Sequence, residues 1–328
     1  MHQGRNRWAH VARQAGSNAV RFGLNLGLVW VFGQVFGAEN TLPGVVAALA
    51  ATLIPFTDYG VRPGVMAFSA ALLLPLGALA GQTALLPAWA AFPLNLGMVL
   101  IIELMTCEPD ARKPAVCFLL AFVFCQATPV PMAAFPRRLA GMALGGAATA
   151  ALTLFFWRRN GFGREGLGWA EQVRRCARQR GYLARMSLGV AGAMLLAALL
   201  GLKKPLWISI VAMSLTQIDW RATRARIGQR AAGTLAGIAL FVPLFRWVIP
   251  PAYNLIGILA IGYVSFFLPA YPHKQAVNAV NALNASMALM SVPAAVANRL
   301  LCLAGGVGIV LLCQGGEALA RRLRAAPR

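Results

Sequence analysis

Long apolar stretches alternate with short polar segments along the whole chain. Twelve of them approach or reach the length of a membrane-crossing helix, for which about 20 apolar residues are needed. They lie at 19–36, 43–56, 64–81, 86–105, 114–133, 137–157, 183–201, 204–218, 230–250, 253–270, 275–292 and 298–316. Since lipid offers no partners to backbone polar groups, such segments are helical. The pattern predicts an all-α, polytopic membrane protein with about 12 transmembrane helices.

The second half of the chain repeats the first half in weakened form. Moving back 161 positions takes Arg299 to Arg138, and moving back 164 positions takes Gly201 to Gly37. Each half then holds six helices, an even number, so the two halves enter the membrane with the same orientation. The sequence therefore predicts two parallel six-helix repeats.

Composition agrees with a membrane protein, and the positions of the charges predict its orientation. Apolar residues make up 59% of the chain and charged residues 12%, which is too little charge for the surface of a soluble domain. With both termini on the cytoplasmic side, 24 of the 30 Lys and Arg fall in cytoplasmic segments, as the positive-inside rule requires. The net charge of +21 favours anionic lipid headgroups as partners over nucleic acid, for which the chain has no motif.

These patterns divide the chain into five parts. They are a basic cytoplasmic tail at 1–18, the first repeat at 19–157, a basic linker at 158–182, the second repeat at 183–316 and a basic cytoplasmic tail at 317–328. Two interpretations of the linker stay open at this point. In the first interpretation, Trp169 to Tyr182 form an amphipathic helix that lies on the inner leaflet. In the second, the linker is a plain connection whose charges only fix the topology.

The sequence favours transport or binding over catalysis. It has no phosphate-binding GxxxxGK[ST] loop, no G-x-S-x-G elbow and no HExxH pair. The six Cys show no CxxC spacing and the three His are scattered, so neither a metal nor another cofactor is expected. The chain is therefore not expected to be an enzyme.

The second helix of each half is short and ends at an acidic residue. The apolar parts begin beside Pro43 and Pro205 and end at Asp58 and Asp219. Short helices at matching positions of two repeats indicate a transporter binding site. Alternatively, each helix continues into a polar loop, and Asp219 pairs with a nearby Arg.

Polar side chains also occur inside the apolar segments. Glu103 lies near the inner end of the fourth helix, where a charge costs up to about 3 kcal/mol, so it either couples protons or forms an interface salt bridge. Asn278, Asn281 and Asn284 are spaced by three on the eleventh helix and follow a slowly rotating face. That face either bonds to a neighbouring helix or lines a pore.

Basic residues on the predicted outer side are a further candidate feature. Lys204 begins the eighth helix, and Arg138 and Arg299 begin the sixth and the twelfth. They would concentrate anions if they formed a positive vestibule. The alternative is that they extend to the outer headgroups.

The stretch from Lys204 to Gly237 resembles the membrane part of the fusaric-acid-resistance-like family, also described as aromatic acid exporters. The residues that carry the resemblance are Lys204, Trp207, Gln217, Asp219, Arg230 and Gly233-Thr234, followed by Asn298-Arg299-Leu300 and a glycine-rich last helix. The resemblance implies a bacterial inner-membrane, multi-pass protein that exports aromatic carboxylic acids. It also implies a periplasmic membrane-fusion protein as partner, and in some members an outer-membrane channel. Plant relatives are anion channels in which two six-helix units surround one pore.

Two features depart from the family pattern. Long members carry sizeable cytoplasmic domains, in whose place this sequence has residues 158–184 and a short Arg-rich tail. The first half also has no Lys or Trp at the positions that match Lys204 and Trp207. If these two side chains contact substrate, only one half does so.

The leading hypothesis is an efflux component for small organic anions that move between the two halves. The residues expected along the substrate path are Lys204, Trp207, Arg138, Arg299, Asn278, Asn281 and Asn284. Those expected in proton coupling or gating are Asp58, Asp219, Glu103, Gln217 and Arg230. The alternatives are a non-transporting scaffold for a periplasmic adaptor and an uncoupled anion channel. Association into a homo-oligomer is left open.

Overall fold

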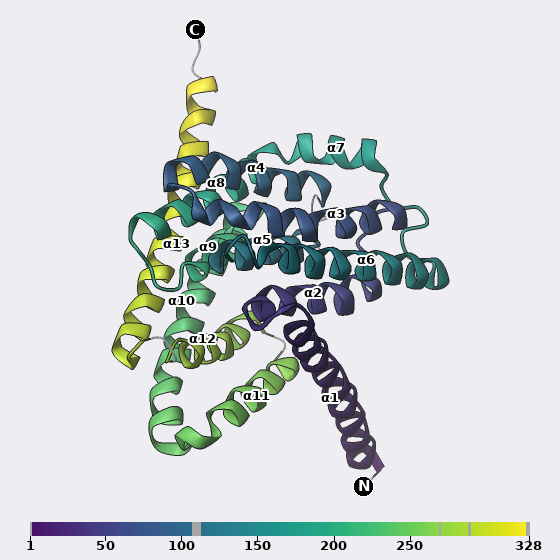
Figure 1. The fold of residues 1–328 in the computed structure, drawn as a ribbon, viewed down its shortest axis with the longest axis vertical. Coiled ribbons are helices and arrows are strands. Elements are labelled where there is room, and N and C mark those ends of the chain that lie inside the picture. Colours follow the sequence, from purple (N-terminus) through teal and green to yellow (C-terminus); the bar gives the residue numbers. More distant parts are fainter. Residues whose placement is uncertain (1, 107–112, 269, 288–289, 326–328) are drawn as a thin grey trace. The chain divides into compact units, whose positions relative to one another are not determined.

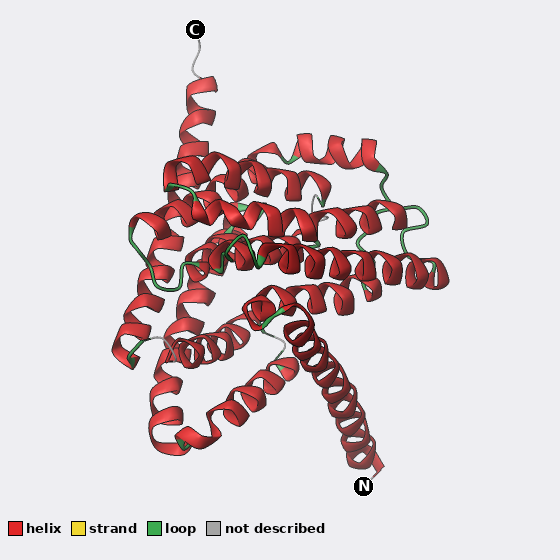
Figure 2. Ribbon diagram, viewed as in Figure 1, coloured by secondary structure: helices red, strands yellow, loops and turns green. Residues whose placement is uncertain are grey.

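The structure, a computed structural model, is built from α-helices joined by short turns (Figures 1 and 2). It describes the chain except residues 1, 107–112, 269, 288–289 and 326–328. No strand occurs in the described residues, where the only bridge pairs Val61 with Leu167. The predicted all-α class is therefore confirmed.

One helix lies in each apolar stretch of the sequence, and one further helix, α7, lies in the basic linker. The first six are α1 (His2–Phe36), α2 (Thr41–Leu53), α3 (Pro63–Gly81), α4 (Ala88–Met105), α5 (Ala115–Ala127) and α6 (Phe135–Asn160). The others are α7 (Trp169–Arg178), α8 (Arg180–Leu199), α9 (Leu206–Leu215), α10 (Trp220–Pro243), α11 (Asn254–Val264), α12 (Tyr271–Met287) and α13 (Val292–Ala325).

Seven helical segments in the described part of the chain are long and apolar enough to cross a membrane. They are formed by α2, α3, α4, α6 and α8, together with most of α1 and of α13. Three shorter apolar helices correspond to α5, α9 and α11. A chain with this many apolar helices is a multi-pass membrane protein. The number of crossings, the repeat and the side of the termini stay predictions. Residues 107–112 and 326–328, which hold part of the predicted cytoplasmic charge, lie outside the described residues.

Residues 28–223 and 302–328 form one compact unit, here called unit 2. Within it α3 packs against α5 and α6, α4 packs against α8, and α5 packs against α9. The core contains Phe118, Phe122 and Trp157, which are fully buried. The indole of Trp157 donates a hydrogen bond of 3.1 Å to the Ile54 carbonyl, which joins α6 to the turn after α2. Unit 2 therefore combines helices from both predicted repeats.

Residues 1–27 and 224–301 form the second compact unit, unit 1. Here α10 lies directly against α12, because a Cβ placed on Gly233 would approach the Pro272 carbonyl oxygen to 2.6 Å. The same test on Gly237 gives 2.4 Å to the Ala276 carbonyl oxygen. Glycines four apart thus bring two helix backbones together, as small residues do in membrane proteins. A small apolar cluster around Phe241 completes this packing.

The first helix of each predicted repeat is followed by one glycine with a positive φ. Gly37 has φ 101° just after α1, and Gly201 has φ 57° after α8. Residues with a Cβ rarely adopt these conformations, so glycine permits the chain to leave the helix there. The short helices α2 and α9 begin a few residues later.

Candidate functional site

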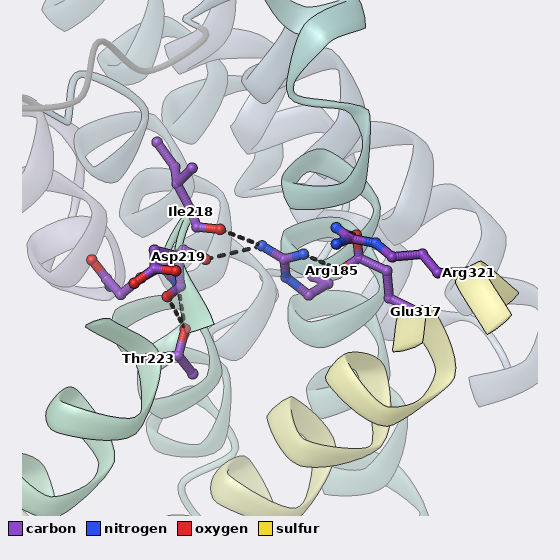
Figure 3. Close-up of polar contacts among 7 residues, drawn as sticks. Arg185, Ile218, Asp219, Thr223, Glu317 and Arg321 are labelled. Atoms are coloured by element: carbon purple, nitrogen blue, oxygen red, sulfur yellow. Dashed lines mark hydrogen bonds and ion pairs between the residues drawn. The ribbon is translucent and has the colours of Figure 1, made fainter. Parts of the chain in front are cut away.

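The Arg185 side chain of α8 connects three parts of unit 2. It is only 8% exposed, and its guanidinium forms an ion pair with Glu317 of α13. It also donates hydrogen bonds of 3.1 Å to the Gln217 carbonyl and 2.9 Å to the Ile218 carbonyl (Figure 3). These two carbonyls follow the end of α9, where the helix leaves backbone acceptors without intrahelical partners. One arginine therefore fixes α8, α13 and the α9–α10 connection.

Glu317 forms ion pairs with two arginines, of which one is buried and the other is exposed to solvent. Besides Arg185 it contacts Arg321, one turn further along α13, at 2.5 Å. The Arg321 side chain is 74% exposed, whereas that of Glu317 is 18% exposed. The carboxylate therefore has a buried partner, which carries most of the interaction, and a solvent-screened partner, which adds little.

The predicted coupling residues Gln217 and Asp219 lie beside this ion pair and shape the start of α10. The Asp219 carboxylate accepts a hydrogen bond of 3.3 Å from the Ala222 backbone N–H, which is the arrangement of a helix N-cap. Thr223 closes the turn, because its hydroxyl accepts from the Gln217 N–H at 3.2 Å and bonds to the Asp219 carbonyl. Asp219 is exposed. The structure thus gives Asp219 a local capping role, and its role in coupling stays a prediction.

The other two predicted acids occupy different surroundings. Asp58 accepts a hydrogen bond of 2.9 Å from the Gly60 N–H in the turn before α3. Glu103 is fully buried at the end of α4, where the Cys176 thiol of α7 contacts its backbone carbonyl at 3.8 Å. Asp58 and Asp219 therefore both shape turns after a short helix, whereas Glu103 is the buried acid among the three candidates.

Lys204 and Trp207 lie at the start of α9. Lys204 lies two residues before Leu206, the first residue of α9. Trp207 is half-buried and packs against the main apolar core of unit 2. Their proximity follows from the sequence, since α9 begins between them.

A groove opens between α8 and α13 next to the Arg185 ion pair. Its volume is about 1060 Å³, and it lies within unit 2. Arg178, Arg180, Arg185 and Arg321 line it together with Glu317 and a set of apolar side chains that includes Phe92, Leu188, Leu195, Ile309 and Leu312. The groove therefore combines apolar walls with a net positive charge.

Arg138 is the most completely buried of the predicted anion-binding residues of unit 2. Its side chain is 1% exposed and lies in α6. It donates to the Asn40 side-chain oxygen at 2.7 Å and to the Glu39 carbonyl at 3.0 Å, and it also bonds to the Thr128 and Cys125 carbonyls. Arg138 therefore connects the turn between α1 and α2 and the end of α5 to α6, and carboxylate binding by this residue stays a prediction.

We expect Arg138→Lys to destabilise the protein by at least about 2 kcal/mol, because one ammonium cannot reach acceptors on three sides. The thermal midpoint in detergent measures this effect. Arg137→Lys is the matched control, since Arg137 is the exposed neighbour in the same helix turn. Equal and small changes in the two variants would contradict the anchoring role. Normal stability with weakened substrate binding would favour the predicted role in carboxylate binding instead.

Unit 1 holds a second group of buried polar side chains between α10 and α12. Arg230 of α10 is 2% exposed and lies 3.4 Å from the Tyr271 hydroxyl, to which it donates a hydrogen bond. The guanidinium of Arg226, one turn earlier, lies 4.0 Å from the centre of the Tyr271 ring, in a cation–π arrangement. Gln275, also buried, lies one turn after Tyr271 in α12. Tyr271 therefore bridges two basic side chains at the start of α12.

The three asparagines of α12 differ in their surroundings. Asn278 is exposed, Asn281 is intermediate and Asn284 is 7% exposed, as expected for residues that rotate slowly around a helix. Among the described residues, the buried Oδ1 of Asn281 and Nδ2 of Asn284 have no hydrogen-bond partner. A buried amide without a partner costs about 1–3 kcal/mol, so these two groups can receive water or a ligand.

The predicted substrate path is thus distributed over both units. Lys204, Trp207 and Arg138 belong to unit 2, whereas Arg299, which is 4% exposed, and the three asparagines belong to unit 1. Among the coupling residues, Arg230 belongs to unit 1 and the other four to unit 2. In the part of the chain that the structure describes, no group of His, Cys, Asp or Glu could hold a metal ion.

The sequence alone did not single out Arg185 and Glu317 as site residues. One signal was present, because Glu317 is the only acidic residue after Asp219. The chain has no Asp or Glu between these two positions, although seven Lys and Arg lie there. Residues 1–27, the other segment of unit 1, also lack acidic residues. Unit 1 therefore carries positive charge that none of its own carboxylates balances.

Apolar helices, several of them long enough to cross a membrane, define a helical, multi-pass membrane protein. Comparison with known proteins shows which family the chain resembles. Residues 192–313 match the fusaric acid resistance protein-like family. The resemblance expected from the sequence is confirmed. The matched part begins in α8 and ends in α13, and it includes Arg230 and the three asparagines of α12.

One curated relative supports the same assignment. Over 98 residues the chain is 31% identical to the inner membrane protein YccS of Escherichia coli (strain K12). The aligned stretch covers 30% of this chain and 13% of the relative. No solved structure matches the chain.

Proposed function

We propose that the protein exports small organic anions, with aromatic carboxylic acids as the substrate class, across the bacterial inner membrane. The observation that carries the proposal is the presence of buried arginines in unit 1, whose sequence has no acidic residue. Arg230 and Arg299 are buried there, and no Asp or Glu occurs in residues 1–27 or 224–301. Guanidinium groups at such sites form strong, charge-assisted hydrogen bonds to an anionic ligand.

The neighbouring groups suit a carboxylate that bears a ring. Arg230 can hold a carboxylate through its fork of N–H donors. The Asn284 Nδ2 is a separate donor further along α12, 13 residues after Tyr271. The Tyr271 ring and the Phe241 cluster belong to the same unit and offer apolar contact for an aromatic ring. The family assignment of residues 192–313 and the relative named as an inner membrane protein support both the membrane and the transport role.

Unit 2 supplies the residues that we assign to gating and coupling. Glu103 is fully buried in α4 and is the candidate for carrying a proton. Asp219 and Gln217 lie on the connection that Arg185 holds, so a movement of α8 would be transmitted to the start of α10. Unit 2 also contains Lys204, Trp207 and Arg138, which we assign to the substrate path. A periplasmic membrane-fusion protein and an outer-membrane channel are the proposed partners.

Flux of 4-hydroxybenzoate in proteoliposomes tests the proposal, with either a pH gradient or a membrane potential imposed. We expect flux that follows the pH gradient and is at least tenfold lower in Asp219→Asn. This substitution removes the charge but keeps an oxygen that can cap α10. Asp219→Ala, which also removes the cap, is the control for a purely structural effect.

The outcomes separate three functions. Flux that follows the potential alone, with Asp219→Asn unchanged, would make the protein an uncoupled anion channel. Absence of flux for several organic anions under both gradients, from protein that keeps its thermal midpoint, would overturn the proposal in favour of a scaffold for a periplasmic adaptor.

A further inference from the structure

We propose that the groove between α8 and α13 binds an anionic phospholipid, with its phosphate at the arginine rim and an acyl chain along the apolar wall. This inference does not rest on the proposed transport function, because none of the residues assigned to the substrate path or to coupling lines the groove. The groove, the neighbouring helix α7 and the charges around both of them carry the argument.

The apolar walls of the groove come from α8 and α13, with Phe92 of α4, and all three helices are long and apolar enough to cross a membrane. Leu188 of α8 is 44% exposed and Leu312 of α13 is 75% exposed, and both line the groove. Exposed leucines on membrane helices face hydrocarbon chains of the bilayer. The groove volume of about 1060 Å³ gives such a chain a defined place to lie.

The positive charge at one end of the groove favours an anionic lipid over a zwitterionic one. Four arginines line the groove, whereas Glu317 is the only acid in its lining. Arg185 and Arg321 share Glu317, and Arg178 pairs with Glu171 of α7 at 3.3 Å, so these three are partly compensated. Arg180 is exposed and forms no ion pair in the part of the chain that the structure describes. Figure 3 shows Arg321 and Glu317 on α13 facing Arg185.

Helix α7 supports a headgroup position for this end of the groove. Gln172 and Cys176 are buried, whereas Arg174 and Arg178 have side chains that are 74% and 69% exposed. Trp169 begins the helix and packs edge-on against Phe68 at 5.7 Å between ring centres. A short helix with a buried face, an exposed basic face and a tryptophan is typical of the membrane interface. The arginine rim begins where α7 ends, so it lies at the depth of the phosphates.

Native mass spectrometry of the delipidated full chain, with added dioleoylphosphatidylglycerol or dioleoylphosphatidylcholine, tests the proposal. We expect selective retention of one phosphatidylglycerol. Arg180→Gln should weaken its binding roughly fivefold, which corresponds to about 1 kcal/mol. Arg158→Gln is the matched control, because Arg158 is an exposed arginine at the end of α6 and does not line the groove.

A second pair of variants tests the acyl-chain position without changing any charge. Gly316 and Gly315 are neighbours in α13, and a Cβ on either residue meets no atom within 4 Å, but only Gly316 lines the groove. We expect Gly316→Leu to weaken phosphatidylglycerol binding at least fivefold and Gly315→Leu to leave it unchanged.

Three results would overturn the proposal. The first is equal retention of the two lipids. The second is an equal effect of the groove variants and their controls, which would indicate a general charge or packing effect. The third is displacement of phosphatidylglycerol by 4-hydroxybenzoate at a concentration that saturates transport, which would make the groove a site for the small anion.

Discussion

Removal of the Glu317 carboxylate is expected to lower the free energy of unfolding by about 3–5 kcal/mol, because Arg185 is then left as a buried charge without its counter-ion. The Arg185 side chain is 8% exposed, and its remaining acceptors are the Gln217 and Ile218 carbonyls. Glu317→Ala should therefore lower the thermal midpoint of the purified protein by many degrees. The same variant should loosen the start of α10, which those carbonyls precede.

Two controls make this prediction specific. Arg321→Gln removes the exposed partner of Glu317 and should cost less than about 1 kcal/mol. The charge swap Arg185→Glu with Glu317→Arg should not restore stability, because a glutamate at position 185 cannot donate to the two carbonyls. A change below about 1 kcal/mol in Glu317→Ala, or full rescue by the swap, would contradict the assigned role.

Replacement of Arg230 by a neutral residue is expected to reduce flux of 4-hydroxybenzoate at least tenfold, which corresponds to about 1.4 kcal/mol of lost interaction with the anion. Arg230 is 2% exposed and belongs to the unit without acidic residues. Arg230→Gln keeps a polar side chain with two N–H donors, but it removes the charge and shortens the side chain. Arg230→Lys keeps the charge and should retain part of the flux, because a point charge replaces the planar fork.

Arg224→Gln is the matched control for Arg230→Gln, since Arg224 is an exposed arginine in the same helix. It should leave flux within about twofold of the unmodified protein. Circular dichroism and the thermal midpoint of each variant distinguish a lost anion site from a damaged fold. Equal flux in Arg230→Gln and Arg224→Gln would remove Arg230 from the proposed path.

The positions of the helices could be predicted from the sequence, because each helix in a membrane satisfies its own backbone and needs a continuous apolar stretch. The stretch at 183–201 covers α8 except its first three residues, and the stretch at 204–218 contains the short α9. The all-α class and the family resemblance followed from the same local information. The local roles of Asp58 and Asp219 also depend on residues within a few positions, namely Gly60 and Ala222.

Contacts between distant residues could not be predicted in this way. Arg138 bonds to Asn40, 98 residues earlier, and nothing in the apolar pattern relates these two positions. Arg185 and Glu317 are separated by 132 residues, and the α8–α13 groove exists only because the two helices lie beside each other. Helices α4 and α8, from different predicted repeats, are neighbours for the same reason.

The sequence by itself determined where the chain is helical, which segments suit a membrane and where positive charge accumulates, since each of these depends on residues close together in the chain. Only the tertiary structure decided which polar groups are buried and which charges meet. It gave Arg138 a packing role and placed Glu317 against Arg185. It also left the Asn284 Nδ2 without a hydrogen-bond partner in the described part of the chain. The physical reason is that burial and pairing depend on helix packing, which many long-range contacts decide together.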